Sequence, residues 1–426
     1  LLAEGYIYSI PKSGYYVSDL SGIPVHQTEC TSETYEAEEQ GTDSRTAKAG
    51  DKVLLTGGKN AFIADFTSNQ TEHAAFPFSI WNKTMRAVMN DYQKEMMINP
   101  PCGGVMELRK SISSYLKEFC AMYVRPEQII IGAGTEYLYS ILIQLLGRNV
   151  CYGVENPGYP KIAKIYRSMG VKYEYIDLDE EGTSAKKLEE KKVDIMHISP
   201  SHHFPTGMVM PISKRYELLG WVTRKKERYI IEDDYDSELR LAGKPIPSLQ
   251  SIDVSGKVIY INTFAKTLCS TVRISYMVLP EALAEKYYRE LSFYSCTVSN
   301  FEQYTLAAFM NAGAFEKHIN RLRNYYQHKR DLILSTFLRE PLGKYITISE
   351  EDSGVHFLMH VNTSMSEQEF LLKTRAKGIR LATLSSFYNA EQKDSRYENT
   401  YVMNYSFVDC DRLEYVAQTL YKIIHP

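Results

Sequence analysis

The sequence lacks any stretch that could serve as a membrane span or a secretion signal. No run of about 18 apolar residues occurs in the chain of 426 residues, although a helix needs roughly 20 such residues to cross a bilayer. The first residues, Leu1-Leu2-Ala3-Glu4, have neither the basic start nor the long apolar stretch of a secretion signal. These absences predict a cytoplasmic protein.

Cysteine pairs and metal-ligand motifs are also missing. The seven cysteines stand singly, and no Cys-x-x-Cys pair occurs, which fits reduced thiols and neither a disulfide nor a zinc site. His202 and His203 are adjacent, so their side chains diverge, and no third ligand stands at helical or hairpin spacing. We therefore expect no metal.

An excess of charge of either sign is absent as well. The chain has 49 basic and 52 acidic residues, so as a whole it has no strong electrostatic reason to bind a polyanion. A basic cluster at residues 224–228 ends a predicted helix, where cations favour the dipole, and a solvated helix end is favoured over a nucleic-acid contact. With 44% hydrophobic positions, a chain of this length predicts two or three globular domains.

The first sixty residues differ in composition from the rest. Residues 1–7 have the pattern of a helix end with Gly5 as its stop, and the segments 8–10 and 15–17 flank a Pro-Lys-Ser-Gly turn. This pattern predicts a helix leading into a β-hairpin. Residues 19–60 have too little apolar content to bury themselves, which predicts a linker.

From about residue 109 onward, apolar runs of strand length alternate with segments of helical period. This alternation predicts an α/β fold with a mainly parallel sheet. The predicted strands are 128–131, 150–154, 173–176, 194–198, 229–231, 258–261 and 274–278. Predicted helices include 136–146, 214–224 and one long helix over 315–337. The long helix would join a large domain, residues 61–334, to a smaller C-terminal one, residues 335–426.

Acidic side chains and a lysine follow two successive predicted strands. Asp233 and its acidic neighbours come after the strand 229–231, and Lys266 follows the next strand. Ligands gather beyond the carboxyl ends of strands in open α/β sheets, so a carboxylate and an amine could meet over one pocket. Taken alone, the acids could instead cap the next element, and such a lysine is more often a solvated surface charge.

Residues 132–136, Gly-Ala-Gly-Thr-Glu, follow another predicted strand and begin a helix. Free backbone N–H groups and the positive end of the helix dipole favour a phosphate there, although a tight turn with Thr135 as N-cap explains the same residues. Arg273 could clamp the phosphate. Tyr159, in a Pro-Gly-Tyr-Pro turn, could present an aromatic face to a flat heterocycle, or be a half-buried turn residue. Each part is common, but the set in this order is not.

Four segments together resemble a known family. Residues 230–238 (Ile-Ile-Glu-Asp-Asp-Tyr-Asp-Ser-Glu), 263–268 (Thr-Phe-Ala-Lys-Thr-Leu), 273–276 (Arg-Ile-Ser-Tyr) and 200–207 (Pro-Ser-His-His-Phe-Pro-Thr-Gly) are similar to the fold-type I pyridoxal-phosphate enzymes, and more closely to the MocR-type regulators of the GntR family. These regulators join a winged helix-turn-helix DNA-binding domain to an aminotransferase-like domain. The resemblance implies a fold-type I aminotransferase-like α/β architecture, with a remnant of the winged helix-turn-helix in residues 1–18.

The resemblance also implies a role for individual residues. Lys266 would hold pyridoxal 5'-phosphate as a Schiff base, and Asp233 would pair with the pyridine nitrogen. Tyr235 would hydrogen-bond the 3-hydroxyl oxygen, and Tyr159 would stack on the ring. The phosphate would be held by Gly134, Thr135, Glu136 and Arg273. Further residues resemble N-terminal features that line the site near the dimer interface, namely Phe76, Pro77, Trp81, Gly103, Gly104, Leu108 and Arg109.

The chain departs from typical aminotransferases near the ring and the phosphate. Phe204 stands where many aminotransferases have an Asn that contacts the 3-oxygen, a change that the regulators share. Ser270-Thr271 replaces a Pro-Gly ahead of Arg273, which would give the phosphate loop a different shape.

A second departure concerns the substrate carboxylate. Aminotransferases bind the substrate carboxylate with an arginine near the C-terminus, and Phe407 falls at the position where that arginine is expected. The charged hydrogen bonds that the arginine would make to the carboxylate are worth roughly 1.5–3 kcal/mol. Lys161 could substitute in part, as a point charge with less geometric control. We therefore expect the effector near Lys161, His203 and Phe407, and expect it to be the cofactor itself or an amine that lacks this carboxylate contact.

These observations favour a sensor. The leading hypothesis is the effector-binding and dimerisation region of a transcriptional regulator, which senses pyridoxal phosphate or its amine adduct at Lys266. It would form a homodimer and reach operator DNA through a domain mostly absent from this sequence. The alternative is an active aminotransferase, because Lys266, Asp233 and Tyr235 suffice for Cα–H activation. A cofactor-free scaffold is a third possibility.

Overall fold

The computed structural model describes residues 7–10, 14–17, 62–241, 246–352, 354–389 and 397–425, and the chain divides into two units, residues 1–59 and 60–426. In the first unit, β1 (Ile7–Ile10) pairs with β2 (Gly14–Val17) as an antiparallel hairpin, which confirms the predicted hairpin. The helix predicted before it and the linker at 19–60 lie outside the described residues, so the winged-helix remnant stays a prediction.

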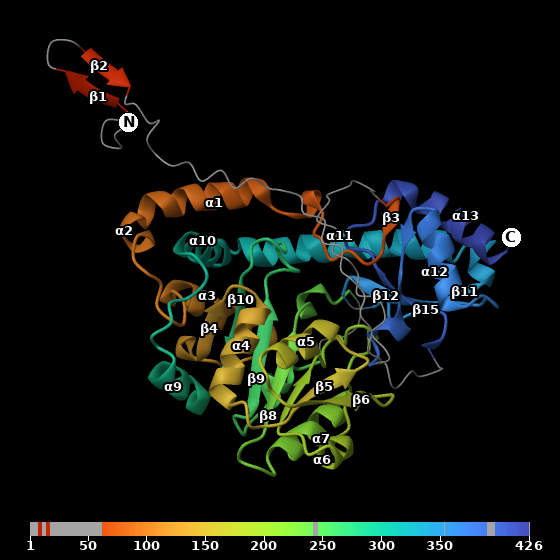
Figure 1. The fold of residues 1–426 in the computed structure, drawn as a ribbon, viewed down its shortest axis with the longest axis horizontal. Helices are drawn as coiled ribbons and strands as arrows, with labels where there is room; N and C mark the ends of the chain where they lie inside the picture. Colours follow the sequence, from red (N-terminus) through yellow and green to blue (C-terminus); the bar gives the residue numbers. More distant parts are fainter. Residues whose placement is uncertain are drawn as a thin grey trace, which may run out of the picture. The chain divides into compact units, whose positions relative to one another are not determined.

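The second unit is built around a seven-stranded sheet, which confirms the predicted fold class (Figure 1). Its order is β4 (Ile129–Gly132), β10 (Ser275–Val278), β9 (Val258–Thr263), β8 (Tyr229–Asp234), β7 (Ile195–Ile198), β5 (Tyr152–Asn156) and β6 (Tyr173–Asp177). Strand β10 runs antiparallel to both of its neighbours, and the other six strands run in one common direction. Three of these strands, β4, β7 and β10, are buried along their whole length, as expected where helices cover both faces of a sheet.

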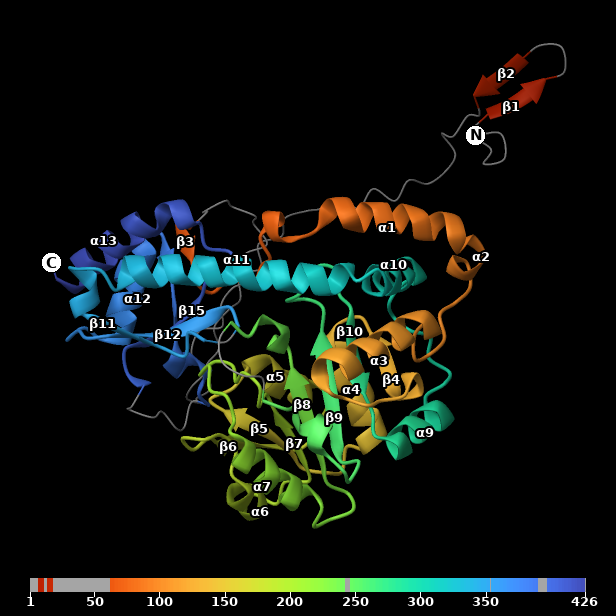
Figure 2. The same cartoon turned by 180° about the vertical axis from the view of Figure 1, so that it is seen from behind.

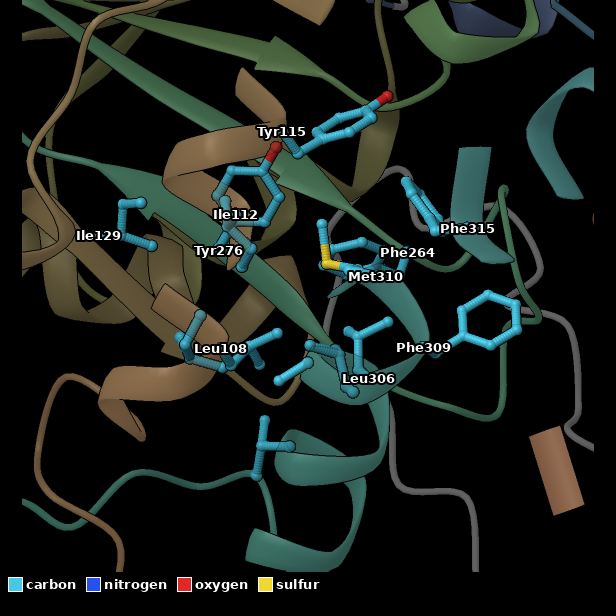
Figure 3. Close-up of a cluster of buried hydrophobic side chains, with 14 of the residues drawn as sticks. Leu108, Ile112, Tyr115, Ile129, Phe264, Tyr276, Leu306, Phe309, Met310 and Phe315 are labelled. Atoms are coloured by element: carbon cyan, nitrogen blue, oxygen red, sulfur yellow. The ribbon is translucent and has the colours of Figure 1, made fainter. Parts of the chain in front are cut away.

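Alternate strand residues belong to different cores because successive side chains point to opposite faces. Ile130 and Met277 pack with α4 (Thr135–Leu146), α5 (Pro160–Ser168) and α9 (Glu281–Glu290). On the other face, Ile129 and Tyr276 pack with α3 (Met106–Cys120) and α10 (Asn300–Asn311), as Figure 3 shows. Farther along that face lies a core that includes α6 (Ala185–Glu190), α7 (Ile212–Val222) and α8 (Leu249–Ile252).

The C-terminal part has its own antiparallel sheet, of order β11 (Ile346–Ser349), β12 (His356–Val361), β15 (Thr400–Asn404) and β14 (Ala382–Thr383). Its core includes α12 (Glu367–Ala376) and α13 (Leu413–Ile424). A short parallel pair joins β3 (Ala64–Asp65) to β13 (Ile379–Arg380), so residues near 64 reach this part of the fold.

One long helix, α11 (Ala314–Phe337), connects the two parts (Figures 1 and 2). Phe315 belongs to the core beside the large sheet, and Ile333 to the C-terminal core. The predicted long helix is therefore confirmed, while the exact domain boundaries stay predictions. The remaining helices, α1 (Phe78–Asp91) and α2 (Gln93–Met96), pack on α10. No described helix is both long and apolar enough to span a membrane.

Candidate functional site

A cavity of about 340 Å³ brings together residues from both parts of the second unit, a size in the range of small-molecule sites. Nine of the eleven predicted site residues line it: Gly134, Thr135, Glu136, Tyr159, Lys161, Asp233, Tyr235, Lys266 and Arg273. Most of them follow the carboxyl ends of parallel strands, which meet at one edge of the sheet. The lining also includes residues from β12, β15 and the segment 386–389.

Asp233 lies at the deep end of this cavity, at the end of β8. Its Oδ2 accepts a hydrogen bond of 2.5 Å from the hydroxyl of Tyr139, a residue of α4, and lies 3.5 Å from Nε2 of His197. The Nδ1 of His197 in turn lies 2.8 Å from the hydroxyl of Tyr166. The other carboxylate oxygen, Oδ1, is buried and has no hydrogen-bond partner among the described residues. Such an oxygen is costly to leave unsatisfied.

Lys266 enters the cavity from the segment that follows β9. Its Nζ donates to Oδ1 of Asn69 at 2.9 Å, and the side chain of Asn404 donates to the same oxygen at 2.6 Å. Burial lowers the pKa of the Lys266 amine, and nearby Asp236 opposes that shift. A lowered pKa favours the neutral amine, which is the nucleophilic form.

Aromatic side chains surround the lysine. The hydroxyl of Tyr235 lies 3.3 Å from Nδ1 of His202, and that nitrogen also lies 2.9 Å and 3.0 Å from the two carboxylate oxygens of Asp236. Tyr159 is 45% exposed and meets Phe204 edge-on, with ring centroids 5.9 Å apart. Tyr159 therefore has an accessible ring beside the cavity, as a stacking residue needs.

The opposite end of the cavity is charged. Gly134 has φ of 92° and precedes α4, and a Cβ at this position would lie 2.2 Å from a guanidinium nitrogen of Arg273. Arg273 donates to Glu136 at 2.6 Å, and Lys161 pairs with the same carboxylate. Burial would raise the pKa of Glu136, but the hydrogen bonds from Lys161 and Arg273 lower it to about 2. The helix N-terminus and two cations thus form an anion-binding corner, with Glu136 between them.

Two expected effector residues do not line the cavity. His203 is buried, its Nδ1 lies 2.7 Å from the hydroxyl of Thr206, and its Nε2 lies 3.4 Å from Glu155. Burial lowers the pKa of His203 to about 3 and raises that of Glu155 to about 8. Near neutral pH the pair is therefore uncharged despite its ion-pair geometry.

Phe407 is 46% exposed and lies three residues beyond the end of β15. The side chain from that strand that does line the cavity is Asn404, three positions before Phe407. An effector role for Phe407 stays a prediction. The N-terminal features also lie elsewhere in the single chain. Leu108 and Trp81 pack in the core beside α10, and Arg109 donates to the Tyr288 hydroxyl at 2.8 Å.

Sequence reasoning missed several lining residues: Asn69, Tyr139, His197, His356 and Asn404. Two of them carried a signal, because His197 and His356 interrupt apolar runs in buried strands. A buried polar group needs a partner, so a polar residue in such a strand marks a candidate site. Asn69 and Asn404 carried no such signal.

A family model for class I and II aminotransferases matches residues 63–396. The chain belongs to this family. Among curated proteins, it is 37% identical to the uncharacterised HTH-type transcriptional regulator YdeL of Bacillus subtilis, over 91% of this chain and 80% of that protein. This relative places the chain in the branch of the aminotransferase family that contains HTH-type transcriptional regulators.

Other relatives include the probable rhizopine catabolism regulatory protein MocR of Rhizobium meliloti, 28% identical over 90% of this chain and 77% of that protein. Among solved structures, the fold is similar to kynurenine aminotransferase from Pyrococcus horikoshii in complex with PMP, with a TM-score of 0.72, 22% identity, and coverage of 86% of this chain and 91% of that one. The resemblance to the MocR-type regulators is thus confirmed. The similarity to the solved structure shows that this chain has an aminotransferase fold.

Proposed function

We propose that this chain is the effector-binding and dimerisation region of a transcriptional regulator that holds pyridoxal 5'-phosphate at Lys266. The observation that carries the proposal is one cavity with three features. It contains the Lys266 amine, an unsatisfied buried oxygen of Asp233, and the anion-binding corner at Gly134 and Arg273. An aldehyde, a protonated ring nitrogen and a phosphate match these features one by one.

Each residue then has a distinct task. When bound, the cofactor supplies an aldehyde that links to amines and an electron-poor ring. Asp233 would accept a hydrogen bond from the ring nitrogen through its free Oδ1, while Tyr139 holds the other oxygen. Arg273 and the N–H groups at the start of α4 would bind the phosphate. Tyr159 would cover the ring face, and Tyr235 would contact the 3-hydroxyl oxygen.

The cavity supports sensing over turnover. Among the described residues, the cations that line it are Lys161, Lys266 and Arg273, and the first and last are paired with Glu136. The wall from β15 presents the neutral Asn404, and Phe204 fills the place of a polar contact to the ring. Such a wall gives an amino-acid carboxylate little to bind.

The alternative function, an active aminotransferase, is supported by the amine, the carboxylate and the tyrosine in one cavity. The two functions differ in what happens to added amino acids. A sensor holds the bound amine without releasing a keto acid, whereas an enzyme releases keto acid over many turnovers. Quantifying keto acid in a mixture of cofactor-loaded protein and amino acids therefore separates the two.

The decisive experiment for the cofactor is reduction with borohydride, followed by mass measurement of the peptides. A reduced cofactor should appear on the peptide that contains Lys266 and should vanish in Lys266→Ala. Lys257→Ala is the matched control, because Lys257 precedes the other end of β9 and donates to the carbonyl of Lys226. Absence of the adduct from the unchanged protein would disprove the proposal.

Control of DNA would require the effector to favour one of two protein states, since a ligand shifts only an equilibrium between states that it binds differently. We expect the full-length regulator to bind DNA upstream of its own or neighbouring genes selectively and in a salt-sensitive manner. Binding should change when the cofactor or an amine is added. Loss of all selectivity in an electrophoretic mobility assay would contradict the regulatory role.

A second copy of the chain is the proposed partner. Met97 and Ile98, which follow α2, are 82% and 65% exposed, although such apolar side chains usually gain by burial. They lie beside α10, because the Asn300 side chain donates to the carbonyl of Ile98 at 2.7 Å. An exposed apolar surface of this kind suits an isologous dimer contact. Light scattering on the purified protein should give the mass of a dimer.

A further inference from the structure

The segment that carries Asn69 is anchored on both sides of this residue, to β15 before it and to α11 after it. Before it, the backbone N–H of Asn404 donates to the carbonyl of Phe66 at 2.9 Å. After it, the carboxylate of Glu72 pairs with Nζ of Lys329 at 2.9 Å. The place of Asn69 in the cavity lining is thus set by contacts other than those of its own side chain.

The amide of Asn69 has one orientation that satisfies its neighbours. The backbone N–H of Ser406 donates to Oδ1 of Asn404 at 3.0 Å, and a backbone N–H can only donate. The other end of the Asn404 amide, Nδ2, is therefore the donor that lies 2.6 Å from Asn69. The atom of Asn69 that faces this donor must be its oxygen, Oδ1. The Nζ of Lys266 donates to the same oxygen at 2.9 Å.

The hydrogen bond between Lys266 and Asn69 depends on a free amine. An amine nitrogen has two or three hydrogens to donate. Attachment to an aldehyde carbon turns Nζ into an imine nitrogen with at most one hydrogen. The attachment and the hydrogen bond to Asn69 therefore compete for the same nitrogen.

We propose that Asn69 is a positioning residue, which receives the Lys266 amine when an effector amine displaces it from the cofactor. This inference rests on the proposed function and deepens it by naming how the site accepts a primary amine. The effector nitrogen forms a double bond to the aldehyde carbon, the double bond from that carbon to Nζ breaks, and one proton passes from the effector nitrogen to Nζ. Asn69 then accepts from the released amine and favours the exchange.

The proposal fixes the direction of three measurements. The hydrogen bond is present while Lys266 is a free amine, is lost when the cofactor is attached, and returns when the effector takes the cofactor over. Its removal should therefore tighten attachment of the cofactor and weaken the exchange by the same factor. Binding of a preformed cofactor–amine adduct begins and ends with a free Lys266 amine, so its affinity should not change. A structural defect at Asn69 would instead weaken all three.

Asn69→Ala removes the acceptor, and propylamine is the probe, because it offers an amine and no other polar group. Attachment is measured by titration of the apo protein with pyridoxal phosphate. Exchange is measured by borohydride reduction at rising propylamine concentration, which traps the cofactor either on the Lys266 peptide or on propylamine. Mass measurement gives the ratio of the two products. The reduced cofactor–propylamine adduct, which cannot react with Lys266, provides the third measurement.

A hydrogen bond of this kind corresponds to about fivefold in an equilibrium constant. In Asn69→Ala, attachment should therefore tighten about fivefold and exchange should weaken about fivefold, while the affinity for the reduced adduct stays unchanged. The amide of Asn404 loses its partner equally in every state, so this loss cancels.

Two further variants support the assignment. Asn69→Asp should reverse both shifts, because a carboxylate holds the released amine more firmly than an amide does. Gln70→Ala is the matched control, since this neighbouring residue is exposed and is not among the described residues that line the cavity. It should leave all three measurements unchanged.

Each outcome bears on one claim. Parallel weakening of attachment, exchange and adduct binding in Asn69→Ala would overturn the inference, as would an Asn69→Ala protein that behaves like the unchanged one. If Asn69→Ala does not fold, the reversed shifts in Asn69→Asp still decide. An unchanged protein that attaches no cofactor at Lys266 would overturn the proposed function, and with it the inference. A protein that attaches the cofactor but lacks the opposite shifts would overturn the inference alone.

Discussion

At the Gly134 end of the cavity, the charges are exposed and paired. Glu136, Lys161 and Arg273 have side chains between 31% and 52% exposed. At the Asp233 end, the carboxylate is 9% exposed, it is held by Tyr139, and one oxygen is left without a partner. Water can rearrange around the exposed charges of the first end, whereas the free oxygen at the second end needs a hydrogen-bond donor inside the cavity.

The difference teaches where affinity and where selectivity should arise. Exposed ion pairs contribute little and are weakened by salt, so the anion-binding corner should attract the phosphate weakly and in a salt-dependent manner. A buried, unsatisfied oxygen is costly without its partner, so the ring end should discriminate strongly between a fitting ligand and a poor one. Three substitutions test this division through cofactor affinity, from the largest expected effect to the smallest, and a fourth, Glu155→Gln, tests the protonation of a buried carboxyl that also lines the cavity.

Asp233→Asn should cause the largest loss of cofactor affinity, about 50-fold. A charged acceptor is replaced by a neutral amide, and a hydrogen bond to a charged group is worth about 1.5–3 kcal/mol. A titration of the apo protein with pyridoxal phosphate measures the change. Asp234→Asn is the control, because Asp234 binds Tyr260 and Ser237 and does not line the cavity. Equal losses in both variants would refute the special role of the ring end.

Glu155→Gln should stabilise the protein at high pH. Burial raises the folded-state pKa of Glu155 from 4.5 to about 8, so this group's contribution to stability is full at low pH and is lost as the pH rises toward 8. Gln has no proton to lose. Relative to wild type, the free energy of unfolding of the variant should be about 3.5 kcal/mol higher at pH 8 than at pH 5.

Denaturant unfolding at the two pH values measures this difference. Glu181→Gln, in an exposed turn, should show no such pH dependence. If Glu155→Gln and the wild type lose stability in parallel between pH 5 and pH 8, the carboxyl is already ionised in the folded protein.

Arg273→Ala should weaken cofactor binding by about tenfold, since one charged contact to the phosphate is lost. The affinity of the wild type should also fall as salt rises from 0.1 M to 1 M, because the screening length shrinks from about 10 Å to about 3 Å. The variant should respond less to salt. Arg289→Ala, at an exposed ion pair outside the cavity, should leave both affinity and salt response unchanged.

Glu136→Gln should have the smallest effect, and of opposite sign. The carboxylate of Glu136 competes with a phosphate for Lys161 and Arg273. Removing its charge should tighten cofactor binding by about threefold, which matches the energy of exposed ion pairs. Weaker binding by this variant would mean that Glu136 supports the phosphate by positioning the cations, instead of competing with it.

The sheet could be predicted from the sequence because buried parallel strands are short apolar runs. The one large shortfall was β8, which was predicted to end at Ile231 and continues to Asp234. Its last residues are acidic, and a strand accommodates them only because Tyr139 and Tyr260 donate to the carboxylates from elsewhere. These hydrogen-bond partners come from distant parts of the chain, so the sequence around β8 does not indicate that the strand continues through its acidic residues.

The same limit applies to the site. Asp233 lies at the end of β8, Lys266 follows β9, and Arg273 precedes the antiparallel β10, so the order of strands in one sheet brought the three together. His356, Asn69 and Asn404 come from distant parts of the chain, and they reach the cavity only through the packing of the C-terminal part. The sequence around Phe407 does not indicate that Asn404, at the end of β15, is the side chain that lines the cavity.

Helix α4 touches both ends of the cavity at once. Gly134 and Thr135 stand at its start, and Tyr139, about 6 Å farther along the axis at 1.5 Å per residue, holds Asp233. The helix backbone therefore fixes the distance between the two ends of the cavity. We expect a cofactor analogue with one extra methylene between ring and phosphate to contact only one end at a time, so that the cavity selects ligands by their length.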